Sequence, residues 1–354
     1  MHPVDRFDLR ARVGKALTAF LAHQRDLLLS VDPALAPVAD AVDAFVLGGG
    51  KRLRPAFAYW GYRGAGGPDG EDVVTAVSAL ELVQASALIH DDLMDGSDTR
   101  RGGPAIHRRF AALHIAGDWP GDPASFGSAS AILLGDLCLV WSDEMLGGAG
   151  LDPVALLRAR RQFDLMRTEV TAGQYLDVLA QASGDTSVSR ASTVARYKSA
   201  KYTVERPLLF GAAMAGADAA VSEAYSGYGL PLGEAFQLRD DILGVFGDPA
   251  ETGKPAGDDL REGKRTYLVA TAFEAASATE AAVLRDGLGD PGLTRADVDR
   301  LRQVITGTGA LRRTEARIVE LTAAALAAVE RVDLAGGAGT VLTELAAAAT
   351  TRAH

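Results

Sequence analysis

The chain of 354 residues carries a net charge of −10, with 48% hydrophobic and 23% charged residues, and its isoelectric point is about 5.2. This acidity argues against nucleic acid as a partner, because a nucleic-acid binder normally shows a basic stripe. One cysteine excludes an internal disulfide framework and favours a reducing, cytoplasmic location, while the lack of a signal-peptide region and of an 18-residue apolar run predicts no transmembrane segment.

Helical periodicity dominates the chain. Apolar side chains recur three and four residues apart, as at Val73, Val77 and Leu80, and abundant alanine and leucine favour helix. Segments rich in glycine and proline separate windows of irregular length, which argues against a repeat architecture. We therefore predict an all-α fold in a single domain spanning residues 1–354. The predicted loops cover residues 48–50, 64–68, 117–123, 147–150, 183–185 and 287–292.

The first basic motif is Gly-Gly-Gly-Lys-Arg-Leu-Arg-Pro at residues 48–55. Glycines expose backbone N–H groups, and the N-terminus of the helix that follows favours an anion. The motif is not a Walker A loop, because Phe45 and Arg52 stand where that loop requires Gly and Ser or Thr. The plainer interpretation is a glycine-rich turn with solvated cations.

The first acidic cluster closes a predicted helix over residues 73–95. Asp91 and Asp95 are four residues apart and share a face, with Asp92 beside them. Three carboxylates repel one another there, and a helix C-terminus disfavours negative charge. A divalent cation would relieve this strain, and Mg²⁺ typically takes one or two carboxylates plus substrate phosphates. The alternative is an ordinary charged helix end.

Two arginines follow these acids directly. Arg100 and Arg101 could bind a phosphate, because a guanidinium donates two parallel hydrogen bonds and is always charged. Their alternative role is charge compensation of the acids. His90 precedes Asp91, and we interpret it as a packed or capping histidine rather than a ligand.

The second acidic cluster, Asp240 and Asp241, follows an apolar helical stretch from about residue 222 in which Pro231 could introduce a kink. Lys254 and Lys264 come after it and could reach a phosphate from a loop, and Lys198 lies upstream in a predicted helix. Each of these lysines taken alone is better explained as a surface charge than as a phosphate ligand.

In this order, the motifs are similar to those of the trans-isoprenyl diphosphate synthases, the polyprenyl synthetase family, and especially to bacterial geranylgeranyl-type members. The resemblance covers roughly residues 40–270. It implies a bundle of long helices around a central cavity, the isoprenoid synthase fold, with helices from residues 294–353 packed on it. The matching segments are GGGKRLRP, DDLMD, DTRRGGPAIH, AILLGDL, GQYLDV, YKSAKYTVERPLLFGA, FQLRDDILGVFGDPAETGKP and DDLREGKRTYL.

The resemblance implies a role for each matching position. The catalytic residues would be the metal-binding aspartates of both motifs together with two cations: Asp91, Asp92, Asp95, Asp240, Asp241, Arg100 and Lys198. The residues expected to contact the allylic diphosphate are Arg100, Lys198, Ser199, Gln237, Lys254 and Lys264. Those expected to contact isopentenyl diphosphate are Lys51, Arg54, Gln84 and Arg101. The resemblance also implies about three Mg²⁺ ions per active site, replaceable by Mn²⁺, and a homodimer.

The chain departs from the family pattern at three places. Gly244 replaces a third aspartate of the second acidic motif, so metal ligation there would depend mainly on Asp240, with Asp241 as a further candidate ligand. Ser199 replaces the usual threonine but keeps its hydroxyl. Residues 117–126 resemble a lineage-specific insertion with no assigned purpose.

The activity that the resemblance implies is prenyl transfer. The allylic diphosphate ionises to an allylic cation with electrostatic help from the metals, the C=C bond of isopentenyl diphosphate attacks, and a proton is lost. A terpene cyclase is one alternative, but it needs no second diphosphate pocket, and Lys51, Arg54 and Arg101 argue against it. The other alternative is a non-catalytic subunit of a heteromeric synthase, which usually lacks acidic motifs that are largely intact here.

Product length is predicted from the helix that carries Asp91. One turn rises about 5.4 Å, close to one extended isoprene unit. Ser86 and Ala87 lie one turn before Asp91 and are small, so a growing tail could pass them, whereas Val83 stands a turn further back and could contribute to a floor. We therefore expect C20, geranylgeranyl diphosphate, with farnesyl (C15) and longer products (C25 or more) as alternatives.

Overall fold

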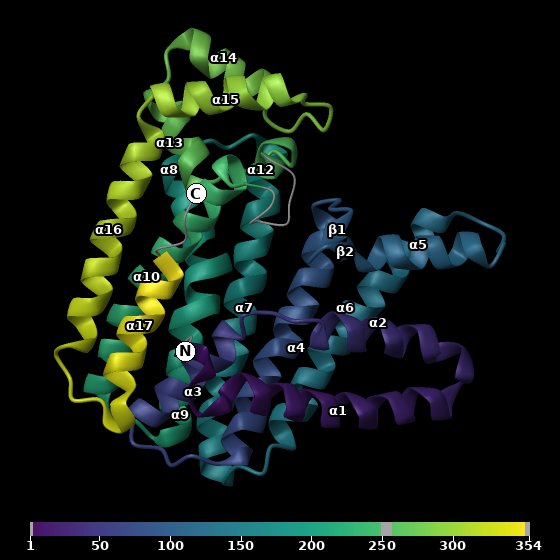
Figure 1. The fold of residues 1–354 in the computed structure, drawn as a ribbon, viewed down its shortest axis with the longest axis vertical. Helices are drawn as coiled ribbons and strands as arrows, with labels where there is room; N and C mark the ends of the chain where they lie inside the picture. Colours follow the sequence, from purple (N-terminus) through teal and green to yellow (C-terminus); the bar gives the residue numbers. More distant parts are fainter. Residues whose placement is uncertain (1–2, 249–256, 351–354) are drawn as a thin grey trace.

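The computed structural model describes residues 3–248 and 257–350, and it confirms the predicted all-α class (Figure 1). In those residues the strands are confined to one hairpin of two short strands, each two residues long. The elements of the first half are η1 (Pro3–Asp8), α1 (Leu9–Val31), η2 (Pro33–Leu35), α2 (Ala36–Leu47), α3 (Leu53–Gly64), α4 (Glu71–Met94), β1 (Thr99–Arg100), β2 (Gly103–Pro104), α5 (Ile106–Ala116), α6 (Pro123–Gly147) and α7 (Pro153–Ser183).

The second half continues with shorter helices around one long one. Its elements are α8 (Val188–Val194), η3 (Ala195–Glu205), α9 (Arg206–Ala215), α10 (Ala219–Phe246), α12 (Asp258–Arg261), α13 (Tyr267–Ala275), α14 (Ala278–Gly287), α15 (Arg295–Gly307), α16 (Ala310–Val329), η4 (Ala335–Gly337) and α17 (Ala338–Thr350). Helix α16 lies along α10 (Figure 1), and Tyr228 of α10 donates a hydrogen bond to the Leu342 carbonyl of α17, at 2.6 Å.

Helix starts follow local capping rules. Asp122 and Asp152 each accept hydrogen bonds from the backbone N–H groups of the first turn, and proline follows each of them as the first residue of α6 and α7. The expected loop over residues 117–123 therefore ends where α6 begins. Helix α10, in contrast, runs through Pro231 without ending there.

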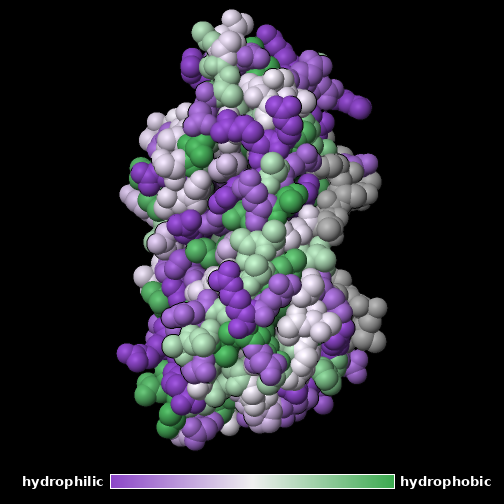
Figure 2. Space-filling model, turned by 90° about the vertical axis from the view of Figure 1, so that its left-hand side faces the viewer, coloured by the Kyte–Doolittle hydropathy of each residue, from purple (hydrophilic) through white to green (hydrophobic). Residues whose placement is uncertain are grey.

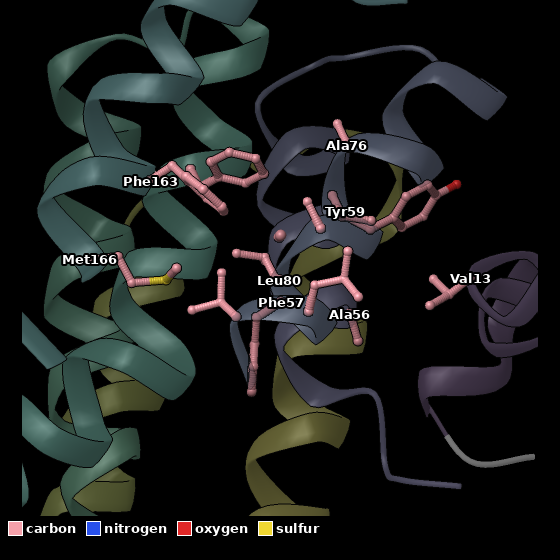
Figure 3. Close-up of a cluster of buried hydrophobic side chains, with 14 of the residues drawn as sticks. Val13, Ala56, Phe57, Tyr59, Ala76, Leu80, Phe163 and Met166 are labelled. Carbon is pink, nitrogen blue, oxygen red and sulfur yellow. The ribbon is translucent and has the colours of Figure 1, made fainter. Parts of the chain in front are cut away.

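The core forms where α1, α3, α4 and α7 meet. Figure 3 shows Phe57 of α3 and Leu80 of α4 facing Phe163 and Met166 of α7. Val13 of α1 approaches the same cluster from the other side (Figure 3). Burial of such side chains stabilises the fold by about 1.5–3 kcal/mol each.

Two glycines let α3 and α9 cross at very short range. A Cβ atom on Gly211 of α9 would lie 1.9 Å from the Ala58 carbonyl oxygen, and one on Gly61 of α3 would lie 2.4 Å from that of Leu208. A side chain at either position would force the two backbones apart, so the crossing requires glycine.

Helices α4 and α6 are long and apolar enough, by length and composition, to cross a membrane. In the most apolar 18-residue window of each helix, 72% of α4 but 39% of α6 is buried. The apolarity of α4 is therefore explained by the core. Helix α6 instead leaves Ile132, Leu133 and Val140 exposed, and it belongs to the part of the molecule, with α1, α2 and α5, that extends to the right in Figure 1.

The side of the molecule that carries α16 has a different surface. Figure 2 views this side and shows hydrophilic residues interspersed with small apolar areas. Val319 of α16 is exposed there as a single large apolar side chain of that helix. Isolated apolar residues of this kind are normal on protein surfaces.

Candidate active site

A cleft of about 720 Å³ lies between the C-terminal ends of α4 and α10, and α7, α8, η3 and the α12–α13 segment complete its walls. Hairpin β1–β2 and α12 lie toward the upper end of the long helices in Figure 1. The apolar lining includes Leu88, Val194 and Leu243. The charged lining residues are Lys51, Asp91, Arg100, Asp177, Lys198, Asp240, Asp241, Asp258, Asp259, Lys264 and Arg265.

Asp91 lies at the centre of a hydrogen-bonded group from three elements. Lys198 of η3 donates to Asp91 Oδ1 at 3.0 Å and to Asp177 Oδ2 of α7 at 2.7 Å. Gln174 of α7 also donates to Asp91 Oδ1, at 3.0 Å. Burial alone would raise the pKa of Asp91, but Lys198, Lys264 and Arg100 outweigh it and lower that pKa.

The β1–β2 hairpin turns Arg100 back onto the acidic end of α4. Its central residues, Arg101 and Gly102, both have positive φ angles, 53° and 77°, as a tight two-residue turn requires. Arg100 Nε donates to Asp92 Oδ1 at 2.8 Å, and its Nη2 contacts the same oxygen. Asp92 is fully buried, and neither it nor Asp95 belongs to the cleft lining among the described residues. In this structure Asp92 orients Arg100.

Asp95 and Lys264 meet at the same end of α4. Lys264 Nζ lies 3.2 Å from Asp95 Oδ2 and 2.6 Å from Glu262 Oε2. Burial, and then the charge of Asp91, raise the pKa of Asp95 to about 6 despite Lys264. Burial would lower the pKa of Lys264, but the surrounding carboxylates raise it well above its ordinary value, so this lysine stays charged.

The second acidic motif faces these groups from α10. Gln237 donates to Asp241 Oδ1 at 2.7 Å. Burial raises the pKa of Asp241 to about 8, the Gln237 hydrogen bond opposes this rise, and Asp259 and Asp240 add to it. A Cβ atom on Gly244 would lie 1.9 Å from Asp259 Oδ2. The carboxylate of Asp259 thus occupies the space that a side chain at position 244 would need.

Lys198 lies in a π-helical segment rather than the α-helix expected from the sequence. Three glycines allow neighbouring helices to touch the backbone of this segment: an added Cβ would lie 2.4 Å from Lys198 N at Gly173, 2.6 Å from Glu205 Cα at Gly229 and 2.5 Å from Ala200 Cα at Gly233. π-Helical turns are rare and frequently occur at functional sites. Close contact with α7 brings the Lys198 ammonium within reach of both Asp91 and Asp177.

The four residues expected to contact isopentenyl diphosphate are placed differently from one another. Lys51 lines the cleft, whereas Arg54, Gln84 and Arg101 do not belong to its lining among the described residues. Arg54 donates to Thr203 Oγ1 at 2.7 Å and stacks over the Tyr202 ring at 4.2 Å. Arg101 donates to the Gly49 carbonyl oxygen at 2.8 Å. Gln84 is half-buried on α4.

The remaining predicted site residues differ in burial and in whether they line the cleft. Ser199 and Gln237 line the cleft. Val83 and Ser86 are buried on α4 and Ala87 is half-buried, while Leu88 is the residue of this stretch that lines the cleft. Lys254 lies outside the described residues. His90 packs against α6, with Nε2 3.2 Å from the Ile132 carbonyl oxygen, which agrees with the expected packing role.

Sequence reasoning missed two residues that line this cleft, Asp177 and Asp259, and one that bonds to Asp91, Gln174. Asp177, Gln174 and Asp259 were not assigned any role, although the first two belong to the GQYLDV segment and the third to DDLREGK. The sequence did contain one signal for Asp177 and Asp259, because each is a carboxylate within a segment that matches the family. The ion pair of Asp177 with Lys198 could not be predicted, because the two residues lie on different helices.

The donor set fits Mg²⁺. Among the residues that the structure describes, no three acidic, histidine or cysteine side chains stand close enough to chelate one ion unaided. Mg²⁺ does not need such a cage, since it takes one or two carboxylates and completes its shell with phosphates and water. Asp91 and Asp95 on α4 and Asp240 and Asp241 on α10 supply hard oxygen ligands. Burial, and then neighbouring carboxylates, disfavour the ionised forms of Asp95 and Asp241 and raise their pKa values, and a bound cation would offset this penalty.

Comparisons with known proteins agree with this geometry. A family model described as polyprenyl synthetase matches residues 36–305. A geranylgeranyl diphosphate synthase of Mycobacterium tuberculosis is 34% identical over 80% of this chain and 77% of its own. A geranylfarnesyl diphosphate synthase of Aeropyrum pernix is 33% identical over 76% and 79%. The crystal structure of a Corynebacterium glutamicum geranylgeranyl pyrophosphate synthase, complexed with isoprenyl diphosphate and magnesium, is 42% identical over 98% of this chain and 99% of that chain, with a TM-score of 0.94.

Proposed function

The chain belongs to the polyprenyl synthetase family, and from this premise we propose how its cleft works and what it makes. It is a trans-prenyltransferase that joins isopentenyl diphosphate to an allylic diphosphate with loss of diphosphate. The observation that carries this function is one cleft in which Asp91 of α4 and Asp240 of α10 meet together with Lys51, Arg100 and Lys198.

The charged residues of the cleft bind the diphosphate and stabilise its negative charge. Arg100, Lys198 and Lys264 bind the allylic diphosphate and stabilise the negative charge that grows on it as the C–O bond breaks. Bound Mg²⁺ ions, about three per site and replaceable by Mn²⁺, supply further charge neutralisation when held by Asp91, Asp95, Asp240 and Asp241. The leaving diphosphate departs with both electrons of the C–O bond.

The new carbon–carbon bond forms at the allylic carbon that has lost the diphosphate. The π electrons of isopentenyl diphosphate attack the allylic cation, and the departing diphosphate accepts the proton that is then lost. Lys51 lines the cleft and binds the isopentenyl diphosphate. We propose that Arg54, Gln84 and Arg101, which are not part of that lining among the described residues, assist Lys51 in holding the double bond in position. Leu88, Val194 and Leu243 line the cleft and exclude the water that would capture the cation.

Geranylgeranyl diphosphate is the product that the observations support best. The similar proteins of M. tuberculosis and C. glutamicum are both named as synthases of this C20 product. Ser86 and Ala87 are small residues one turn before Asp91 on α4, and Val83 follows one turn deeper; we propose that the growing tail passes the first two and stops near the third. The nearest alternatives are a C25 product, because the A. pernix relative is a geranylfarnesyl diphosphate synthase, and a C15 product, because a similar protein of Mycobacterium bovis is a farnesyl diphosphate synthase.

A homodimer is the form in which this enzyme works. The support is the apolar face of α6, where Ile132, Leu133 and Val140 are exposed on a helix that is otherwise packed against α4 and α5. Exposed apolar side chains gathered on one face are typical of a protein–protein interface.

The test is turnover by the purified protein. It is incubated with Mg²⁺, labelled isopentenyl diphosphate and, in separate reactions, dimethylallyl, geranyl or farnesyl diphosphate, and the products are sized after removal of the diphosphate. Geranylgeraniol as the main product is the expected result. Release of diphosphate without consumption of isopentenyl diphosphate would instead identify a cyclase, and activity that needs an added partner would identify a non-catalytic subunit.

A further inference from the structure

The loop between α2 and α3 has an unusual backbone. Gly49 and Gly50 have φ angles of 109° and 129°, and Arg52, which has a side chain, has a φ of 50°. A left-handed conformation is costly for a residue with a Cβ atom and persists where the surroundings impose it. Something must therefore hold Arg52 in place.

The restraint on Arg52 comes from inside the molecule. Its side chain leaves the loop and enters the core, where it is 8% exposed. One guanidinium nitrogen donates to Glu81 Oε2 of α4 and the other to the Val46 carbonyl oxygen at 2.7 Å. Glu81 is itself 6% exposed. The loop is thus tied both to α4 and to the last turn of α2.

The same loop is held from its other side by the β1–β2 hairpin. Arg101 donates to the carbonyl oxygens of Gly49, at 2.8 Å, and Phe45, at 3.3 Å. Its Nη2 would lie 3.3 Å from a Cβ atom added to Gly50. Lys51, between the two restrained positions, lines the cleft. Arg52 and Arg101 together therefore fix the direction in which Lys51 leaves the loop.

Glu81 is a carboxylate placed among several guanidinium groups. Burial lowers the pKa of Arg101, the charges of Arg52, Arg100 and Arg54 lower it further, and Glu81 opposes them. Glu81 thereby limits the repulsion among these guanidinium groups.

A stability role alone does not explain a charged pair at this place. Two well-packed apolar side chains usually stabilise a fold as much as a buried ion pair or more, because burial removes the hydration of both charges. An ion pair does fix direction and distance, which apolar packing does not. The loop that it fixes carries Lys51 and leads into the first turn of α3, where Arg54 lies.

We propose that the buried Arg52–Glu81 pair is a positioning element for isopentenyl diphosphate: it holds the loop over residues 48–52 so that Lys51 and Arg54 present their charges to that substrate. Neither Arg52 nor Glu81 belongs to the cleft lining among the described residues, so both would act through the loop. The inference depends on the proposed function, because it assigns the loop to the isopentenyl side.

The first test breaks the pair and measures both substrates separately. Glu81→Gln keeps the shape but removes the charge, and it should raise the KM for isopentenyl diphosphate about tenfold, since small misplacement of binding groups is costly. The KM for the allylic diphosphate should change less than twofold. Glu169→Gln is the matched control: Glu169 bonds to Arg206 and Lys201 away from this loop, and it should leave the ratio of the two KM values unchanged.

The second test separates positioning from folding. Arg52→Met combined with Glu81→Leu removes both charges and keeps the volume, so the midpoint of thermal unfolding should stay near that of the unmodified protein. The KM for isopentenyl diphosphate should nevertheless remain about tenfold raised. An ordinary KM in this stable double variant would overturn the inference. If the unmodified protein does not consume isopentenyl diphosphate at all, the proposed function fails instead, and the two outcomes are distinct.

Discussion

Single charged side chains hold the cleft together by contacting more than one partner each. Lys198 joins Asp91 of α4 to Asp177 of α7, and Lys264 lies between Asp95 and Glu262. A diphosphate that enters the cleft competes for the same ammonium groups. The carboxylates that it displaces become available to cations, so binding of the two charged species is expected to be mutually dependent.

The aspartates of the two motifs should be indispensable for turnover. Asp91→Ala and Asp240→Ala are each expected to lower kcat by about a hundredfold or more, because a lost metal ligand removes several kcal/mol of charge stabilisation. Circular dichroism should show unchanged helix content. Excess EDTA should abolish turnover by the unmodified protein, and added Mg²⁺ or Mn²⁺ should restore it. Full activity in EDTA would refute metal dependence.

Cys138 should be chemically inert in the folded protein. It is fully buried on α6, and burial raises the pKa of its thiol to about 12. The reactive thiolate is therefore absent from pH 7 to 9, and labelling by a thiol reagent should not increase across that range. In the unfolded chain the thiol ionises near pH 8.5, so this group lowers the free energy of unfolding above that pH. Rapid labelling without denaturant would contradict the burial.

At the scale of whole elements, glycine decides how closely helices approach. Gly61 and Gly211 set the crossing of α3 and α9, and Gly173 and Gly233 bring α7 and α10 against the π-helical segment. These contacts join packing to function, because the π-helical segment carries Lys198. The sequence predicted a helix there but gave no sign of its π-helical form.

Substitution of Gly211 should separate these effects from ordinary helix propensity. Gly211→Ala places a Cβ atom 1.9 Å from the Ala58 carbonyl oxygen, and overpacking of this kind typically costs about 1–3 kcal/mol. Gly14→Ala is the control, because a Cβ atom there meets nothing within 4 Å, and it should stabilise α1 by about 0.5–1 kcal/mol. Urea unfolding measures both changes. Equal effects at the two sites would show that the crossing tolerates a side chain.

Helix α4 should also set the length of the product. Ser86→Phe inserts an aromatic ring one turn before Asp91 and should shift the main product from C20 toward C15. Val83→Ala, one turn deeper, should allow longer products. Both are checked by sizing the prenyl alcohols obtained from each variant. Products of unchanged length in both variants would show that the tail does not run along this face of α4.

At the scale of the molecule, the cleft and the core occupy different stretches of the long helices. The C-terminal ends of α4 and α10 enclose the cleft, while the cluster in Figure 3 forms the core where α1, α3, α4 and α7 meet. The face of α6 is left apolar and exposed, in contrast to the mixed surface that Figure 2 shows on the side of α16.

Assembly should depend on the α6 face. Leu133→Lys, at a position 66% exposed on α6, is expected to convert a dimer into monomers in sedimentation experiments, because a charge would be buried at the interface. Val319→Lys on α16, at a position 70% exposed, is the matched control and should leave the molecular mass unchanged. A monomeric unmodified protein would exclude the proposed homodimer.

The sequence by itself determined what depends on local spacing. Helical periodicity predicted the all-α class and the extent of α4, and Asp91 and Asp95 could be placed on one face because they are four residues apart. The motifs and their order were sufficient to predict the family. These features need no knowledge of which helices are neighbours.

Tertiary structure decided every feature that depends on two distant segments meeting. The contact of Lys198 with Asp177, the ion pair of Arg52 with Glu81, and the filling of the space at Gly244 by Asp259 each join residues on different elements. The sequence could not predict these pairs, because many arrangements of helices bury similar apolar area, and the packing that selects one of them depends on the detailed shapes of side chains across the whole core.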